Sequence, residues 1–541
     1  MKSYKKLAIL AVPILTVVTG CTKLDETLNS SLTRSEATAA LGTQGTALLL
    51  NAAYTDITGS FFSQDAVFSL EENTSDESLV PTRGGDWDDN GVWRVLHAHT
   101  WNADHGQILN VFNSLNKLNF DATNVLTFKP NAKQEAEARF LRALSLYYLL
   151  DLYGQFPFRE PGEDLRNAPK VYSGAEGVNF IISELTAVLP NLNASDPITR
   201  ATPNAANFLL MKCYLQKGAF INRATPTFDA ADMQKVMSLG NAIIAGGKYS
   251  LTANYFDNFS VDNDIKSTEG IFTYPNTSGV SVNHGGIEAR WNMTLHYNMY
   301  TPANPNAGWN GFSTISEFYN TFGVNGTPTT FSSADAALDK RIGEVPYAGS
   351  TNISGLRPGF LVGQQYNENG VAIKDRKGAP LAFDPKISAN MIETGSNLEV
   401  TGIRVVKYVP DYTSNGKYYG GPAGNNLMIF RYADVILMVA EAKQRTGDAA
   451  GALKMVNDLR ATRGAAPLTS MALVDASNVD APNTLLAERG RELYWESFRR
   501  TDLIRFGVFL KPWGLKPNDD PKNLVFPIPS QALAANPNLK Q

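Results

Sequence analysis

The chain has 541 residues and is 43% hydrophobic and 10% aromatic, a composition that predicts a globular protein with a large buried core. Its formal net charge is -4, and no Lys/Arg-rich run follows the N-terminal segment, so we do not expect nucleic acid as a partner. It has two cysteines in all, Cys21 and Cys213, and once the first carries the lipid predicted below no intramolecular disulfide can form, so its stability should come from packing.

The first twenty residues have the pattern of a secretory signal peptide. Basic residues precede an apolar run over 7–18, and Thr19 and Gly20 stand directly before Cys21. The run is about a dozen residues long, whereas a helix needs about 20 to span a bilayer, which indicates export and not a permanent membrane span. We therefore predict a lipoprotein signal peptide over 1–20 and a lipid on Cys21. The alternative is an ordinary secretory signal whose cysteine is incidental.

Apolar residues recur at helical spacing through the next region, residues 21–220. Amphipathic helices are expected around 48–53 and 108–118, and the clearest helix covers 138–150, with Gly154 stopping it.

A further helix is expected to start at Pro203, with Thr202 as its N-cap. Cys213 lies on its apolar face and is interpreted as a packed thiol. We expect this helix to pack against the helix over 138–150 as a hairpin.

The middle region, residues 221–425, is rich in Gly, Asn, Thr and aromatic residues and shows no periodicity, so we expect loops there. Helical spacing returns in residues 426–541. One helix begins near Phe430, Gly447 ends it, and Asp448 caps the next.

A last helix is expected from about Pro482 to Arg500, and its many charges are interpreted as a structural ion-pair network. Small alanines on neighbouring helices allow the close approach that is typical of tetratricopeptide (TPR) hairpins. The sequence therefore predicts a mainly α fold: TPR-like hairpins supporting an irregular region, with residues 21–541 as one compact unit.

Several segments, in this order, resemble landmarks of the SusD/RagB family of outer-membrane nutrient-binding lipoproteins. Residues 137–157 read EARFLRALSLYYLLDLYGQFP, 200–215 read RATPNAANFLLMKCYL, 430–441 read FRYADVILMVAE, and 488–506 read ERGRELYWESFRRTDLIRF. Residues 526–529, FPIP, resemble the family's closing signature.

The resemblance implies a non-catalytic lipoprotein that binds oligo- or polysaccharide and delivers it to a SusC-like TonB-dependent transporter of the outer membrane. Lys23, Asp25 and Glu26 resemble the acidic tag that sends such lipoproteins to the cell surface. The expected location is therefore the cell outer membrane, lipid-anchored and surface-exposed.

Two segments have the residues that a sugar site needs: aromatic rings for stacking, with polar groups beside them for the hydroxyls. In residues 71–93, Trp87 is flanked by Asp86, Asp88 and Asp89; in 290–312, aromatic residues stand among asparagines. We hypothesise that Trp87 and Trp309 stack on sugar rings. The other candidate ligand-binding residues are Asp76, Arg83, Asp88, Trp93, Trp291, Tyr297, Asn310 and Arg357. The alternative for each tryptophan is packing in the core or in a loop, which we expect for Trp101, at the start of a helix, and for Trp495, within one.

Enzymatic readings find little support. No carboxylate pair is singled out for glycoside hydrolysis, and no GxSxG elbow or P-loop is present. His97, His99 and His105 suggest a metal, but no further ligands complete a known pattern, so hydrogen-bonded histidines are preferred. We expect no catalytic residues, metal or cofactor. The runner-up function is a surface receptor for a peptide or glycopeptide that uses the same kind of transporter.

Overall fold

The computed structural model describes residues 34–278, 286–299, 308–324, 337–343, 357–367, 370–410 and 423–541. The predicted signal peptide and Cys21 lie outside these ranges. The chain forms two units, Met1–Gly42 and Thr43–Gln541. Helix α1 (Arg34–Phe61) breaks at Gly42, where the backbone has a φ of 51° that favours glycine. No helix within the described ranges is both long and apolar enough to cross a membrane.

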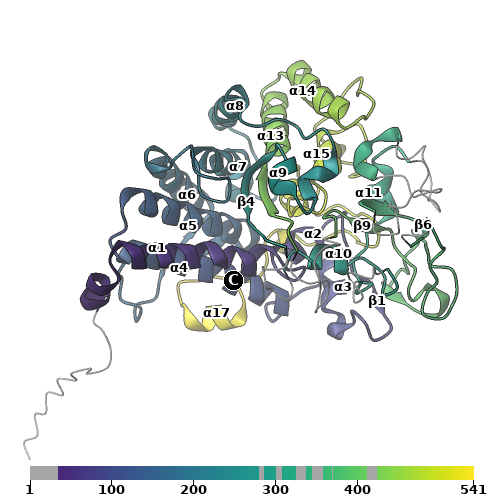
Figure 1. Ribbon diagram of the computed structural model, residues 1–541, viewed down its shortest axis with the longest axis horizontal. Helices are drawn as coiled ribbons and strands as arrows, with labels where there is room; N and C mark the ends of the chain where they lie inside the picture. The colour runs from purple at the N-terminus through teal and green to yellow at the C-terminus, as the bar shows by residue number, and fades with distance from the viewer. Residues whose placement is uncertain are drawn as a thin grey trace, which may run out of the picture. The chain divides into compact units, whose positions relative to one another are not determined.

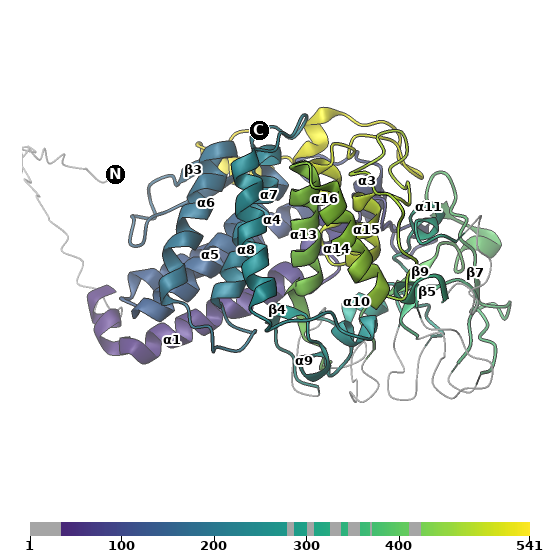
Figure 2. The ribbon, with the colours of Figure 1, turned by 90° about the horizontal axis from the view of Figure 1, so that it is seen from above.

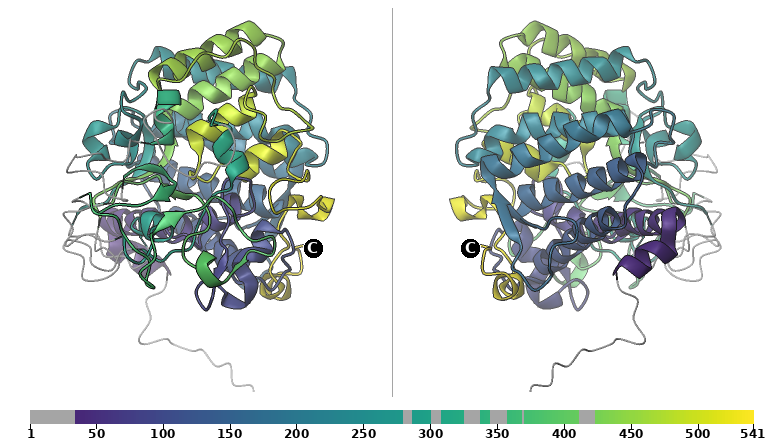
Figure 3. Two further views of the ribbon diagram at one scale, coloured as in Figure 1. Left: turned by 90° about the vertical axis from the view of Figure 1, so that its right-hand side faces the viewer. Right: turned by 90° about the vertical axis from the view of Figure 1, so that its left-hand side faces the viewer.

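Seven helices of the second unit pack in a continuous series (Figures 1 and 2). They are α4 (Gly106–Thr127), α5 (Ala132–Tyr153), α6 (Gly174–Val188), α7 (Pro203–Ile221), α8 (Ala230–Ala245), α13 (Tyr432–Arg445) and α14 (Ala449–Thr462). Each packs on the next, and α8 packs on α13 although the two are far apart in sequence. In the two views of Figure 3, turned by 90° from Figure 1, these helices lie in successive layers. The predicted mainly α class is confirmed.

The predicted helix ends are largely confirmed. Gly154 takes a left-handed conformation after α5, and the Thr202 side chain accepts the Ala205 amide at the start of α7. Asp448 caps α14 in the same way. Cys213 is fully buried, as predicted.

Several expectations about helices were wrong. The helices over 138–150 and from Pro203 are not partners in one hairpin, because α5 packs mainly on α4 and α6, and α7 on α6 and α8. Helix α8 lies inside the range expected to be irregular. Trp101 does not open a helix, since α4 begins at Gly106. Trp101 and Trp495 are nevertheless buried in the core, as expected.

The single helix predicted from about Pro482 to Arg500 is two helices, α15 (Leu485–Leu493) and α16 (Arg499–Arg505). At the break, Trp495 and Ser497 have positive φ angles of 57° and 67°. The backbone amide of Trp495 donates to the carboxylate of Glu77, and that of Ser497 to Glu72. Buried carboxylates from a distant segment thus replace the helical acceptors of these amides, which explains the break.

The charges of α15 form the predicted ion-pair network. Glu492 accepts hydrogen bonds from three buried guanidinium groups, at 2.7, 2.7 and 2.9 Å. Burial alone would raise the pKa of Glu492, but these positive charges hold it far below its ordinary value. The three donors are Arg431, Arg463 and Arg341, which also pair with Glu496, Glu269 and Glu488 respectively. The network joins α15 to the irregular region.

The other described residues of the second unit form short strands, short helices and loops. Its strand pairs are β1 (Thr82–Arg83) with β8 (Ile392–Glu393), β2 (Gln155–Phe158) with β3 (Lys170–Ser173), β4 (Gly270–Tyr274) with β10 (Leu427–Arg431), β5 (Gly359–Leu361) with β9 (Arg404–Val406), and β6 (Gly363–Gln364) with β7 (Ala382–Phe383). The pair of β1 and β8 is parallel and the others are antiparallel. The short helices are α2 (Val67–Glu72), α3 (Val92–His97), α9 (Asn263–Lys266), α10 (Ala289–Asn292), α11 (Ser316–Asn320) and α17 (Ser530–Ala535).

Candidate functional site

Trp87 lies in the turn that follows β1, and its backbone is unusual. Trp87, Asp89 and Asn90 all have positive φ angles, 58°, 38° and 57°. Non-glycine residues adopt this conformation at a cost, and such residues gather at functional sites. Tertiary contacts therefore hold this turn in a conformation that its sequence does not favour.

Those contacts join the two predicted stacking tryptophans. The Trp87 indole Nε1 donates a 2.7 Å hydrogen bond to the backbone oxygen of Trp309. The Trp87 ring packs edge-on against Trp93 and Phe312, each with ring centroids 5.4 Å apart. It also covers Gly311, where a Cβ would lie 2.3 Å from Trp87 Cε2. Trp87 and Trp309 are each half-buried, so part of both side chains faces solvent.

A polar group surrounds this aromatic pair. The Tyr297 hydroxyl donates to Asp86, the residue before Trp87. The Arg376 guanidinium lies 3.9 Å from the centre of the Tyr297 ring, and its Nε donates to Glu399 at 2.8 Å. We call Asp86, Trp87, Tyr297, Trp309 and Arg376 the aromatic–polar cluster. It brings together three separate loops.

His296 and Glu399 hold the cluster in place through hydrogen bonds, because Glu399 accepts from both Arg376 and His296. The Asn298 amide donates to His296 Nδ1, so His296 Nε2 is the protonated nitrogen and donates to Glu399 at 2.8 Å. Burial lowers the pKa of His296 to about 4 despite the neighbouring carboxylate. Burial would raise the pKa of Glu399, but hydrogen bonds from Arg376 and His296 hold it below its ordinary value. At neutral pH the histidine is neutral and Glu399 is ionised.

Several other predicted site residues are buried and already bonded inside the protein. The Asp76 carboxylate pairs with Arg499 at 2.6 Å, and Arg83 donates to the Thr401 carbonyl at 2.8 Å. Asn310 accepts from Arg404 at 2.9 Å.

Of the remaining candidate residues, three are bonded or buried inside the protein and one is half-exposed. Trp93 donates to Asp89, Trp291 is fully buried, and Arg357 is buried with its guanidinium on the Phe360 carbonyl. Asp88 is half-exposed and pairs with Arg94 at 3.1 Å. Burial favours a supporting role for the buried residues, and direct ligand contact by any of the candidates stays a prediction.

Sequence reasoning did not find Arg376, Glu399 or His296. No pattern in the sequence marks them, because loop folding alone brings them to Tyr297 and Asp86. The one available signal was that Asp86 stands beside Trp87.

The three clustered histidines are each hydrogen-bonded, as preferred. His97 contacts the backbone oxygens of Ser78 and Gly514, and His99 contacts Asp519 and the Thr74 oxygen. His105 contacts the Val92 oxygen. Burial lowers the pKa of all three. In the ranges that the structure describes, no group of three or more His, Cys, Asp or Glu side chains is arranged to hold a metal ion.

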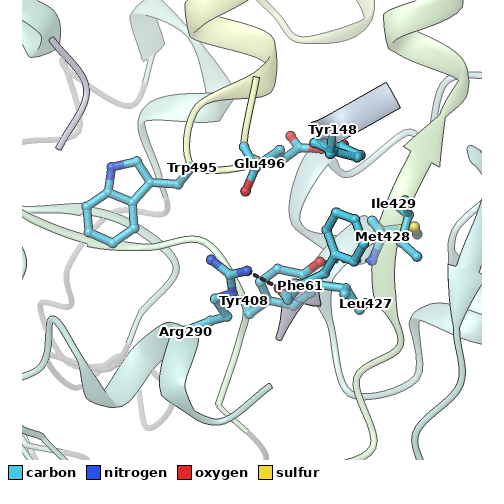
Figure 4. A pocket seen from close by; sticks show the side chains of 10 residues that line it. Phe61, Tyr148, Arg290, Tyr408, Leu427, Met428, Ile429, Trp495 and Glu496 are labelled. Carbon is cyan, nitrogen blue, oxygen red and sulfur yellow. Dashed lines mark hydrogen bonds between the residues drawn. The ribbon is translucent and has the colours of Figure 1, made fainter. Parts of the chain in front are cut away.

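Three cavities lined by described residues of the second unit lie away from the aromatic–polar cluster. One, of about 20 Å³, is lined by Arg290, Tyr408, Trp495 and Glu496 among others (Figure 4). That volume suits one water, whereas ligand pockets measure about 300–1,000 Å³.

Two open hollows, of about 370 and 540 Å³, share Gln155 and Lys540. The larger has no aromatic lining, and the rings that line the smaller, Trp101, Tyr153 and Phe526, are all buried. Neither therefore offers an exposed ring for stacking.

Comparison with known proteins finds similarity to the SusD family. The SusD family model matches residues 268–522. The starch-binding protein SusD of Bacteroides thetaiotaomicron is 28% identical over 411 residues, covering 72% of this chain and 67% of that protein. SusD-like protein P25 of Formosa agariphila is 24% identical and covers 87% of this chain and 81% of its own. The chain is therefore similar to SusD family proteins in sequence.

Solved structures of the SusD superfamily share the fold. A Parabacteroides distasonis member superposes with a TM-score of 0.67 at 18% identity, over 94% of this chain and 99% of that one. Surface glycan-binding protein A of Bacteroides thetaiotaomicron, in complex with laminarihexaose, gives 0.61 at 16% identity, over 92% and 99%. The SusD/RagB resemblance found in the sequence is confirmed.

Proposed function

We propose that this protein binds oligo- or polysaccharide at the aromatic–polar cluster without turnover. The observation that carries the proposal is the meeting of Trp87, Trp309 and Tyr297 with exposed polar groups of Asp86 and Arg376. Rings offer faces for the C–H surfaces of sugars, and the charged groups beside them bond hydroxyls. The relatives support it by name: one is a starch-binding protein and another was solved with laminarihexaose.

We further propose that the protein is anchored at the outer surface of the outer membrane and hands its glycan to a SusC-like TonB-dependent transporter. The support is the lipoprotein signal pattern before Cys21 and the match of residues 268–522 to the SusD family model. A lipid anchor would hold the protein beside a membrane transporter, so binding need not be tight.

The carboxylates at the site, Asp86 of the cluster and the neighbouring Glu399, support binding and not hydrolysis. Glycoside hydrolysis needs one carboxyl group that stays protonated to act as the general acid. Glu399 has a lowered pKa and bonds to Arg376 and His296, and Asp86 accepts from Tyr297. Glu399 is therefore ionised and unsuited to donate a proton.

The proposal is tested by calorimetric titration of the full chain, in a detergent without sugar headgroups, against a panel of polysaccharides and their monosaccharides. We expect one glycan to bind, and its polymer to bind better than its monosaccharide. Trp309→Ala and Trp87→Ala should each weaken binding at least ten-fold, about 1.4 kcal/mol. Trp309→Phe keeps an aromatic ring and should therefore weaken binding less than Trp309→Ala does.

A panel with no binding would reject the glycan proposal and favour the runner-up, a receptor for a peptide or glycopeptide. Full binding by Trp309→Ala and Trp87→Ala would reject the cluster as the site. Unfolding midpoints of the variants control for loss of structure.

A further inference from the structure

Arg376 is held in one orientation while half its side chain remains exposed. Its Nε donates to Glu399 Oε1 at 2.8 Å, its backbone amide donates to Glu399 Oε2 at 3.1 Å, and its guanidinium lies over the Tyr297 ring. Its side chain is still 46% exposed. The outer edge of the guanidinium is therefore a preorganised pair of donors facing solvent.

An acceptor lies beside those donors. Asp86 Oδ2 is 3.8 Å from Arg376 Nη2, and the Asp86 side chain is 49% exposed. Tyr297 donates to Asp86 and so fixes the carboxylate in place. The Asp86–Arg376 pair therefore presents a donor and an acceptor to the same ligand, next to the half-exposed Trp87.

Two adjacent hydroxyl groups match this pair, because each hydroxyl both donates and accepts. We propose that Asp86 and Arg376 together bind two adjacent hydroxyls of a neutral sugar and thereby select uncharged glycans over uronic acid polymers, an inference that rests on the proposed glycan-binding function. The pair replaces Asp76 and Arg83, the hydroxyl partners expected from the sequence, whose side chains are bonded inside the protein.

A sugar carboxylate would fit this pair poorly. It offers acceptors only, so it leaves the Asp86 carboxylate without a donor, and the negative charges of Asp86 and Glu399 repel it. The guanidinium of Arg94, in the segment that follows Trp87, already bonds to Asp88 and Thr82.

Other charges also surround the pair. Lys374 and Lys377 are exposed on the same loop as Arg376. Arg83, Arg404 and Glu393 are buried beneath. The selectivity is therefore assigned to the bonded pair and not to net charge, and Lys374 provides a control.

The experiment is calorimetric titration of the full chain, in a detergent without sugar headgroups, with matched hexasaccharides at physiological ionic strength. The probes are maltohexaose, laminarihexaose, cellohexaose and mannohexaose, and each of these chains oxidised to the carboxylate at C6. The variants are Arg376→Gln, Arg376→Lys and Asp86→Asn, with Lys374→Gln as a control of equal charge change.

We expect at least one neutral hexasaccharide to bind and its oxidised counterpart to bind at least ten-fold more weakly. Arg376→Gln should weaken neutral binding at least ten-fold, and Arg376→Lys should not restore it, because an ammonium lacks the planar donor fork. Asp86→Asn should reduce the difference in affinity between the neutral and the oxidised hexasaccharides. Lys374→Gln should bind within two-fold of the wild type.

Oxidised chains that bind as tightly as neutral ones, or full affinity in Arg376→Gln, would overturn the inference while leaving the glycan-binding function intact. A loss as large in Lys374→Gln as in Arg376→Gln would also overturn it, since net charge would then explain the result. If Arg376→Gln does not fold, the inference is judged on Asp86→Asn: an unchanged difference in affinity between neutral and oxidised chains in that variant would overturn it. No binding by any probe would reject the function and the selectivity together.

Discussion

Replacing Gly311 by alanine should displace Trp87 and show whether its packed position matters. The added Cβ would lie 2.3, 2.6 and 2.7 Å from Cε2, Cζ2 and Nε1 of Trp87, distances that real contacts do not reach. Gly311 has no positive φ, so alanine adds no backbone strain and the ring must move. Movement would break the 2.7 Å bond from Trp87 Nε1 to the Trp309 oxygen.

The expected cost follows from those contacts. Overpacking of this kind costs about 1–3 kcal/mol. A lost hydrogen bond adds about 1 kcal/mol. We therefore expect Gly311→Ala to lower the free energy of unfolding by about 2–4 kcal/mol. Glycan affinity should fall as well, because the Trp87 ring leaves its place beside Trp309.

The assay is urea unfolding followed by tryptophan fluorescence, together with calorimetric titration. Gly85→Ala is the matched control, because Gly85 lies in the same turn as Trp87 and its Cβ would meet no atom within 4 Å. The control should change stability by less than about 0.5 kcal/mol. Wild-type stability and affinity in Gly311→Ala would refute the reasoning that Trp87 is held by close packing.

The buried charges give two more predictions. Glu492→Gln removes the negative charge that three buried guanidinium groups share, so it should lower the free energy of unfolding in urea by about 3–5 kcal/mol. The control Glu135→Gln, at a half-exposed carboxylate, should lower it by less than about 0.5 kcal/mol. Equal losses of stability in the two variants would contradict a buried network. For Asp502, burial would raise the pKa, but Arg489 and Arg505 lower it to about 2, below its unfolded value. Its contribution, about 2 kcal/mol, is thus present above pH 4 or so and lost as pH falls through 2. Unfolding at several pH values should show the gap between wild type and Asp502→Asn shrinking as the pH falls, and a constant gap would count against this assignment.

Local patterns in the sequence fixed much of the helical scaffold. Thr202 and Pro203 start α7, Gly154 ends α5, and Asp448 caps α14, because capping depends on residues within one turn of the helix end. The charges of α15 also identified a structural network, since so many acidic and basic residues cannot be buried unless they pair. These features need no knowledge of distant contacts.

Tertiary structure alone decided the break between α15 and α16 and the composition of the candidate site. The break exists because the carboxylates of Glu72 and Glu77, far upstream in the sequence, accept hydrogen bonds from the backbone amides of Ser497 and Trp495. Asp76 and Arg83 became internal partners for the same reason, while Arg376 reached Tyr297 through the folding of separate loops. A sequence pattern shows which side chains are available, but burial and long-range pairing determine which of them stay free to meet a ligand.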